Sequence, residues 1–222
     1  MDGSQEGDGS PLIAIVDYNA GNLTSVSRAV KHLGYCCLVT KEVSAIKDAE
    51  RIIFPGVGAA GSAMESLSSL GLQDAIVSAF RQGTPILGVC LGTQIIMGYS
   101  EENNVPCFGI IKGRVRPFPQ NLVSEDGRRL KVPHMGWNLL RRRSAHPILA
   151  GIREDDEFYF VHGYYPAPDD RCHVIGETEY GIRFPSVLGT KNLVATQFHP
   201  EKSGRPGLTI LKNFCEWQPA VS

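Results

Sequence analysis

Short apolar runs that each end at a turn or a glycine recur through the first half of the sequence and constrain its fold more than any other feature. Runs that are apolar at nearly every position are typical of strands buried on both faces of a parallel sheet. Segments with helical spacing alternate with them, at residues 22–33, 61–82 and 91–100. The apolar runs are LIAIVDY (12–18), YCCLVT (35–40), RIIFPGVG (51–58) and PILGVC (85–90). This alternation predicts an α/β fold with a mainly parallel central sheet flanked by helices, in which ligands bind beyond the carboxyl ends of the strands.

The second half of the chain has a different pattern. Strand-like segments with turns every ten or so residues replace most of the helices, which predicts antiparallel strands added to the parallel core. Residues 206–217 have the apolar spacing of a closing helix. Because no linker or repeat divides the 222 residues, we expect one domain over residues 12–218, preceded by a flexible, polar leader at residues 1–11.

Composition and charge exclude several classes of function. With 22 basic and 23 acidic residues, the chain has no general attraction for nucleic acid or membrane surfaces. It also has no apolar segment long enough to span a bilayer and no secretion signal. Its six cysteines form no C-x-x-C pair, so a zinc ribbon and a thioredoxin-like redox site have no support. Free thiols without a secretion signal predict a cytoplasmic protein.

Cys90 stands between two glycines in the sequence GVCLG, where an apolar run ends and a helix is expected to begin. Flanking glycines allow a sharp strand-to-helix turn that exposes a nucleophile at a helix N-terminus, where the helix dipole favours a thiolate. The backbone N–H of Leu91 would then face a developing oxyanion. A buried core cysteine is the competing interpretation, because cysteine is among the most buried residue types.

A histidine and a glutamate two residues apart, His199 and Glu201, follow the apolar run LVAT in the sequence QFHPEKS. A cysteine nucleophile needs a base, usually histidine, and a third group that orients the imidazole. On an extended segment the two side chains would lie on one face, within reach of each other. Alone, the pair could be a surface turn; together with the turn at Cys90, it favours acyl-transfer chemistry.

The glycine-rich turn PGVG follows another buried run and ends at Gly58. Glycines after a strand can leave backbone N–H groups free to face a ligand oxygen. Most such turns are plain connections, but one beside a nucleophile is a candidate second oxyanion donor. We therefore expect the backbone of residues 56–58 to form part of the same site.

PGVG, GVCLGTQ and QFHPEKS, in this order, resemble the class I glutamine amidotransferases that use a catalytic triad. DYNAGNLTSV (17–26), PHMGWN (133–138), FYFVHGYY (158–165) and HPEKSG (199–204) are further similar to the glutaminase-subunit family of imidazole glycerol phosphate synthase. The resemblance covers roughly residues 12–216, nearly the whole chain. It implies a flavodoxin-like α/β fold and the hydrolysis of L-glutamine to glutamate and ammonia.

The resemblance also implies roles for individual residues. Cys90 would be the nucleophile, His199 the general base and acid, and Glu201 the group that orients it. The other implied positions are Val57 and Leu91 as backbone oxyanion donors, Gly56, Gly58, Gln94, Gly163 and Tyr164 as substrate contacts, and Asn19, Trp137 and Lys202 at the partner interface. For the interface positions, a turn asparagine, a half-buried core tryptophan and a surface lysine are the alternatives.

The family passes its ammonia to a cyclase subunit with a (β/α)8-barrel fold, with which it forms a heterodimer in histidine biosynthesis. The expected single domain accounts for nearly the whole chain, so the resemblance implies that the cyclase is a separate partner chain. It also implies no metal or cofactor. The alternatives are a paralogous amidotransferase feeding another synthase, a cysteine peptidase or esterase, and an inactive scaffold subunit.

One position departs from the family pattern. Gly163 stands where the family usually carries serine or threonine after the histidine of the FVH motif. We expect this glycine to weaken glutamine binding or to loosen the loop.

Overall fold

The structure is a computed structural model that describes residues 12–19, 21–124 and 126–219. Within these residues the largest sheet has eight strands in the order β2-β1-β3-β4-β14-β13-β12-β9. The five strands from β2 to β14 are parallel, and the last three are added antiparallel. The strands are β1 (Ile13–Val16), β2 (Cys37–Thr40), β3 (Arg51–Gly56), β4 (Ile86–Cys90), β9 (Arg141–Arg142), β12 (Val174–Glu179), β13 (Arg183–Thr190) and β14 (Leu193–Thr196). The mainly parallel core expected from the sequence is confirmed.

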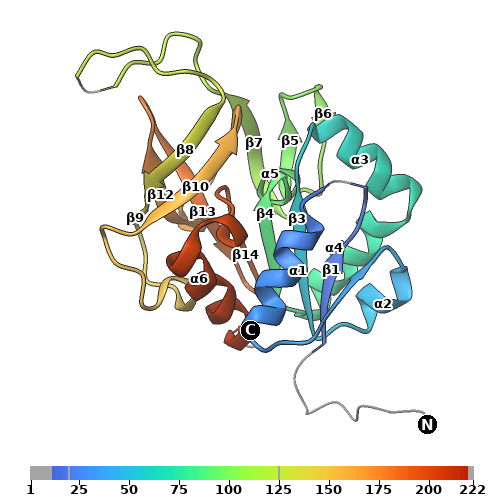
Figure 1. Cartoon of the computed structure of the whole chain (residues 1–222). Helices are drawn as coiled ribbons and strands as arrows, with labels where there is room; N and C mark the ends of the chain where they lie inside the picture. The colour runs from blue at the N-terminus through green and yellow to red at the C-terminus, as the bar shows by residue number, and fades with distance from the viewer. Residues whose placement is uncertain (1–11, 20, 125, 220–222) are drawn as a thin grey trace.

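Helices cover both faces of the parallel strands (Figure 1). Alternate residues of β1 divide between two buried clusters: Ile13 and Ile15 pack with α1 and α6, and Ala14 and Val16 pack with α2, α3 and α4. This division follows from the alternation of side chains along a strand. The helices are α1 (Leu23–His32), α2 (Val43–Lys47), α3 (Ala60–Ser69), α4 (Leu72–Gln82), α5 (Leu91–Ile95) and α6 (Gly204–Glu216).

The second half of the chain also builds two smaller sheets. One pairs β10 with β8, and the other has the order β11-β7-β5-β6. Their strands are β5 (Met97–Ser100), β6 (Val105–Pro106), β7 (Ile111–Pro117), β8 (His134–Leu139), β10 (Glu157–His162) and β11 (Tyr164–Pro168). Three short 3-10 helices, η1 (Pro147–Leu149), η2 (Arg171–His173) and η3 (Pro200–Lys202), complete the described elements. The antiparallel strands expected for the second half are therefore present.

Three local expectations differ from the structure. The helix predicted over residues 61–82 is two helices, because Gly71 adopts a left-handed φ of 67° between α3 and α4. The helix predicted over residues 91–100 ends at Ile95, since the residues from Met97 onward pair with β7. Helix α2 was not predicted at all. The closing helix at residues 206–217 is confirmed as α6, and the proposed leader at residues 1–11 lies outside the described residues.

Candidate active site

Cys90 ends the buried strand β4, and α5 begins at the next residue. Its backbone has φ 54° and ψ −104°, a strained conformation for a residue with a side chain. The neighbouring glycines make this turn possible. A Cβ atom on Gly92 would overlap the carbonyl oxygen of Phe54, and one on Gly88 would lie 3.0 Å from the Cβ of Ala195. The expected sharp strand-to-helix turn is therefore present, and its glycines are needed for close packing.

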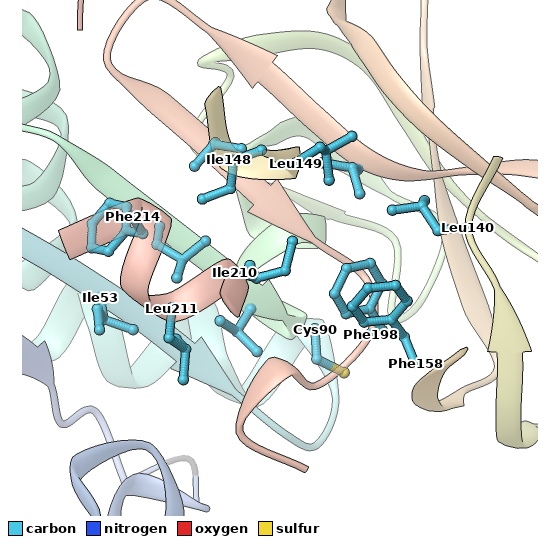
Figure 2. Packing of buried hydrophobic residues seen from close by; sticks show 14 of the residues in the cluster. Ile53, Cys90, Leu140, Ile148, Leu149, Phe158, Phe198, Ile210, Leu211 and Phe214 are labelled. Carbon is cyan, nitrogen blue, oxygen red and sulfur yellow. The ribbon is translucent and has the colours of Figure 1, made fainter. Parts of the chain in front are cut away.

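The environment of Cys90 has features of both a buried core cysteine and a cysteine at a binding cavity. The residue is only 5% exposed and belongs to the buried apolar cluster that also holds Phe158 and Phe198 (Figure 2). It also lines a cavity of about 260 Å³. Cys90 is thus held rigidly like a core residue, while its side chain borders a space that a small substrate can enter.

His199 and Glu201 form a buried pair behind this position. Nδ1 of His199 donates a hydrogen bond to Oε1 of Glu201 at 2.8 Å, and both side chains are at most 2% exposed. The expectation of an extended segment is wrong, because Glu201 lies in η3, which begins at Pro200. The backbone N–H of His199 donates to the carbonyl oxygen of Tyr159 at 2.9 Å, so the residue is held from β10 as well.

The charge environment of His199 suits a proton-transfer role. Burial lowers its pKa, but the nearby Cys90 and Glu201 side chains outweigh burial and raise the pKa above its ordinary value. Because Nδ1 donates to Glu201, Nε2 is the nitrogen left for the thiol. Nε2 is buried and has no hydrogen-bond partner among the described residues. The arrangement favours the imidazolium form of His199.

The cavity brings together most of the positions expected for substrate and oxyanion contacts. Gly56 pairs with Cys90 across β3 and β4, which brings the PGVG turn beside Cys90. The cavity is lined by Val57, Gly58, Cys90, Leu91, Gln94, Glu102, Val161, His162, Gly163 and Tyr164. Gly56 is the one expected substrate contact outside this lining; a Cβ there would overlap the hydroxyl of Tyr18, so close packing explains that glycine.

Glu102 is a lining residue that sequence reasoning missed, and it is the one carboxylate among the lining residues. Its Oε2 accepts a hydrogen bond from the backbone N–H of Ala60 at 2.8 Å, which ties it to the start of α3. A carboxylate in this cavity can bind the α-ammonium group of an amino acid. No motif surrounds Glu102 in the sequence, so only the fold reveals it.

His162 is a second missed residue, and it supports the wall formed by Gly163 and Tyr164. Its Nδ1 donates to the carbonyl oxygen of Tyr164 at 2.7 Å, and its Nε2 lies 3.3 Å from Nδ1 of His134. Burial lowers the pKa of His162 to about 3, so the ring is neutral at physiological pH. Gln94 donates to the same carbonyl oxygen at 3.1 Å. This wall is therefore held by hydrogen bonds from two sides.

The three expected interface residues lie apart from the cavity lining. Asn19 is exposed in the turn after β1, and Trp137 is 53% exposed on β8, which contradicts its alternative as a half-buried core residue. The Lys202 ammonium lies 5.8 Å from the ring centroid of Tyr159, and the Trp137 and Tyr159 ring centroids are 5.9 Å apart. Trp137 and Lys202 thus meet at one aromatic side chain.

No cluster of side chains suited to a metal ion occurs among residues 12–19, 21–124 and 126–219. Over the same ranges, the helices are too short or too polar to cross a bilayer.

Comparison with known sequences adds to this geometry. Residues 14–217 match the model of the class-I glutamine amidotransferase family. The chain is 49% identical over 203 residues to the imidazole glycerol phosphate synthase subunit HisH of Nitratidesulfovibrio vulgaris (strain DP4), covering 91% of this chain and 95% of that protein. It is 45% identical over 210 residues to the HisH subunit of Dechloromonas aromatica (strain RCB), covering 93% and 97%.

Solved structures share the fold. One is a putative GMP synthase subunit from Thermoplasma acidophilum, with a TM-score of 0.69 at 20% identity, covering 95% of this chain and 94% of that one. Another is PurLQS from Thermotoga maritima, with a TM-score of 0.66 at 17% identity, covering 93% and 98%. At these identities the likeness extends to the α/β architecture alone.

Proposed function

The chain belongs to the class-I glutamine amidotransferases, among the relatives of the HisH subunits of imidazole glycerol phosphate synthase, and on this basis we propose how its residues release ammonia from glutamine. It is a glutaminase that serves histidine biosynthesis. One observation carries the residue assignment: the buried, hydrogen-bonded pair of His199 and Glu201 lies beside Cys90, which borders the cavity on a strained turn.

In the proposed reaction, Sγ of Cys90 attacks the side-chain amide carbon of glutamine. The C–N bond of the tetrahedral intermediate then breaks, and His199 gives the departing nitrogen its proton, leaving a glutamyl thioester. Water attacks the thioester, His199 takes up one of its protons, and the C–S bond breaks to release glutamate. Glu201 keeps the His199 ring in the orientation that both steps need. Overall, glutamine and water give glutamate and ammonia.

Binding of the substrate falls to the rest of the cavity. The backbone N–H groups of Val57 and Leu91 stabilise the oxyanion of the tetrahedral intermediate. Glu102 binds the α-ammonium group, since it supplies the negative charge in the lining. The remaining contacts with glutamine come from Gly58, Gln94, Gly163 and Tyr164, which line the cavity.

The partner of a HisH subunit is a cyclase subunit that uses the ammonia. We propose that this partner is a (β/α)8-barrel that forms a heterodimer with the chain in the cytoplasm. Its docking face includes Trp137 and Lys202, with Asn19 at the margin. Exposed apolar side chains on β8 support this choice: Met135 is 63% exposed and Leu139 is 43% exposed, and both flank Trp137.

The Cys90→Ala substitution tests the assignment in the complex with the cyclase subunit. Without the thiol, no thioester forms, so glutamine-dependent turnover should fall by roughly 10⁴-fold or more. Turnover with added ammonia should persist, because the cyclase reaction does not need the thiol. Cys107→Ala removes a half-buried thiol outside the cavity lining and serves as the matched control. Glutamine hydrolysis by Cys90→Ala at the wild-type rate would refute the assignment.

A further inference from the structure

The segment DYNAGN at residues 17–22 carries a residue that the catalytic roles above leave unused. Asn22 precedes α1 at the N-cap position, with a left-handed φ of 64°. Asparagine at this position normally accepts a hydrogen bond from the first turn of its own helix. Here the side chain makes no such cap. Something other than capping therefore accounts for how this side chain is placed.

The amide of Asn22 instead reaches across the fold to the catalytic pair. Its Nδ2 donates a hydrogen bond to Oε1 of Glu201 at 2.6 Å, over a separation of 179 residues. The same oxygen accepts the bond from Nδ1 of His199 at 2.8 Å. Oε2 of Glu201 is buried without a partner among the described residues. Within the described chain, the amide and the imidazole are thus the two side-chain donors on this carboxylate.

We infer that Asn22 is a positioning residue of the active site, fixing the Glu201 carboxylate so that it orients His199. The amide touches neither the cavity nor the thiol, so it acts through Glu201. A carboxylate held by one donor only can rotate about its terminal bonds, and the second donor restricts this rotation. The inference rests on the catalytic roles proposed above for Cys90, His199 and Glu201.

The arrangement explains why asparagine stands at this position. A left-handed backbone favours glycine, asparagine and aspartate. Of these three, asparagine has a side-chain N–H that can donate to a carboxylate, whereas glycine has no side chain and ionised aspartate only accepts. Asparagine therefore satisfies both requirements, because it tolerates the left-handed backbone and supplies a side-chain donor.

The Asn22→Gly substitution tests the role of the side-chain amide independently of the backbone conformation. Glycine relieves the left-handed conformation, so folding is preserved while the donor is lost. In the complex with the cyclase subunit, we expect glutamine-dependent kcat to fall roughly 10- to 100-fold, as for loss of a hydrogen bond to a charged group. Asn22→Asp keeps the size and the turn preference of asparagine but lacks the donor. Its glutamine-dependent kcat should fall to a similar extent. Asn104→Gly relieves another left-handed asparagine, with φ 51° in an exposed turn outside the cavity lining, and should retain wild-type turnover.

A pH profile distinguishes positioning from a general structural defect. Burial lowers the pKa of His199, and the charges of Cys90 and Glu201 raise it further than burial lowers it; His162, which also faces it, is neutral. If Glu201 turns away, the pKa of His199 falls. The imidazolium is then lost at a lower pH, so the alkaline limb of kcat/KM should move to lower pH in Asn22→Gly. A structural defect alone would reduce activity at every pH without moving this limb.

The outcomes separate this inference from the proposed function. Cys90→Ala, measured in the same series, must lose glutamine hydrolysis for the catalytic roles to hold. If Cys90→Ala is inactive while Asn22→Gly and Asn22→Asp keep wild-type kcat and an unmoved alkaline limb, the positioning role is wrong and the catalytic roles stand. If Cys90→Ala remains active, the proposed function itself fails.

Discussion

The two walls of the cavity come from differently built parts of the molecule. One wall is carried by the parallel strands: β3 delivers the PGVG turn and β4 delivers Cys90, and both strands are buried along their whole length. The other wall, Val161 to Tyr164, joins β10 and β11 of the two smaller sheets, and these strands are only partly buried. The buried wall holds Cys90, the proposed nucleophile, and the partly buried wall carries proposed substrate contacts and continues toward the proposed docking face.

The difference shows how the fold divides its tasks. A nucleophile needs a fixed position, and close packing on both faces of a parallel strand supplies it. A substrate wall next to a partner can be more adaptable, since side-chain hydrogen bonds help to hold it, such as those from His162 and Gln94 to the carbonyl oxygen of Tyr164. If this division is correct, equivalent substitutions in the two walls should have very different consequences.

The largest contrast is expected between two glycines. In Gly92→Ala the new Cβ overlaps the carbonyl oxygen of Phe54, a backbone atom that cannot move aside without disturbing β3. We expect the free energy of unfolding to fall by about 3 kcal/mol or more, with loss of glutaminase activity. Urea unfolding followed by circular dichroism measures this change.

Gly163→Ala is the matched control in the opposite wall. Its Cβ would approach nothing more closely than Cγ1 of Val132, at 3.9 Å. Its free energy of unfolding should stay within about 0.5 kcal/mol of the wild type. Equal destabilisation by Gly92→Ala and Gly163→Ala would contradict the division into a tightly packed and an open wall.

The same contrast governs what could be predicted from the sequence. Cys90 and its glycines lie within five residues, and His199 and Glu201 within three, so local pattern sufficed to find them. Even there, the pair was expected on an extended segment, because Pro200 and η3 were not foreseen. Asn22, Glu102 and His162 could not be found in this way. They reach the site only through long-range folding, as the separation of 179 residues between Asn22 and Glu201 illustrates.

The parallel sheet was predictable for a related reason. Strands buried on both faces are apolar at nearly every position, so β1, β3 and β4 stand out from any neighbouring segment. Strands β8 and β10 of the smaller sheets are less buried and so are less continuously apolar; in β8 only His134 is buried. Strand β5 was mistaken for the end of a helix because its pairing with β7 is a tertiary feature that Met97–Ser100 does not encode locally.

An intermediate effect is expected at Glu102, which lies between the two walls in the turn after β5. Glu102→Gln keeps an acceptor for the backbone N–H of Ala60 but removes the negative charge that would bind the α-ammonium group. The KM for glutamine should rise roughly 10- to 100-fold, with a smaller change in kcat, since the lost contact exists before and during the reaction. Steady-state kinetics with the cyclase complex gives both constants.

Glu101→Gln is the control for this charge. The neighbouring carboxylate does not line the cavity, so its loss should leave KM unchanged. A KM that responds equally to both substitutions would mean that the general charge of this turn, and not a contact with substrate, affects binding.

The smallest effect is expected where the partly buried wall departs from the family pattern. Gly163 has room for a side chain, and its φ lies outside the left-handed region, so Gly163→Ser can be accommodated without strain. The added hydroxyl can form a hydrogen bond with a neutral polar group of the substrate, and the side chain narrows the conformations open to the loop. Because a neutral hydrogen bond contributes about 0.5–1.5 kcal/mol, the KM for glutamine should fall roughly 2- to 10-fold with kcat nearly unchanged. An identical KM in the wild type and in Gly163→Ser would show that the glycine neither weakens glutamine binding nor loosens this wall. The proposed difference in rigidity between the two walls would then be wrong at this position.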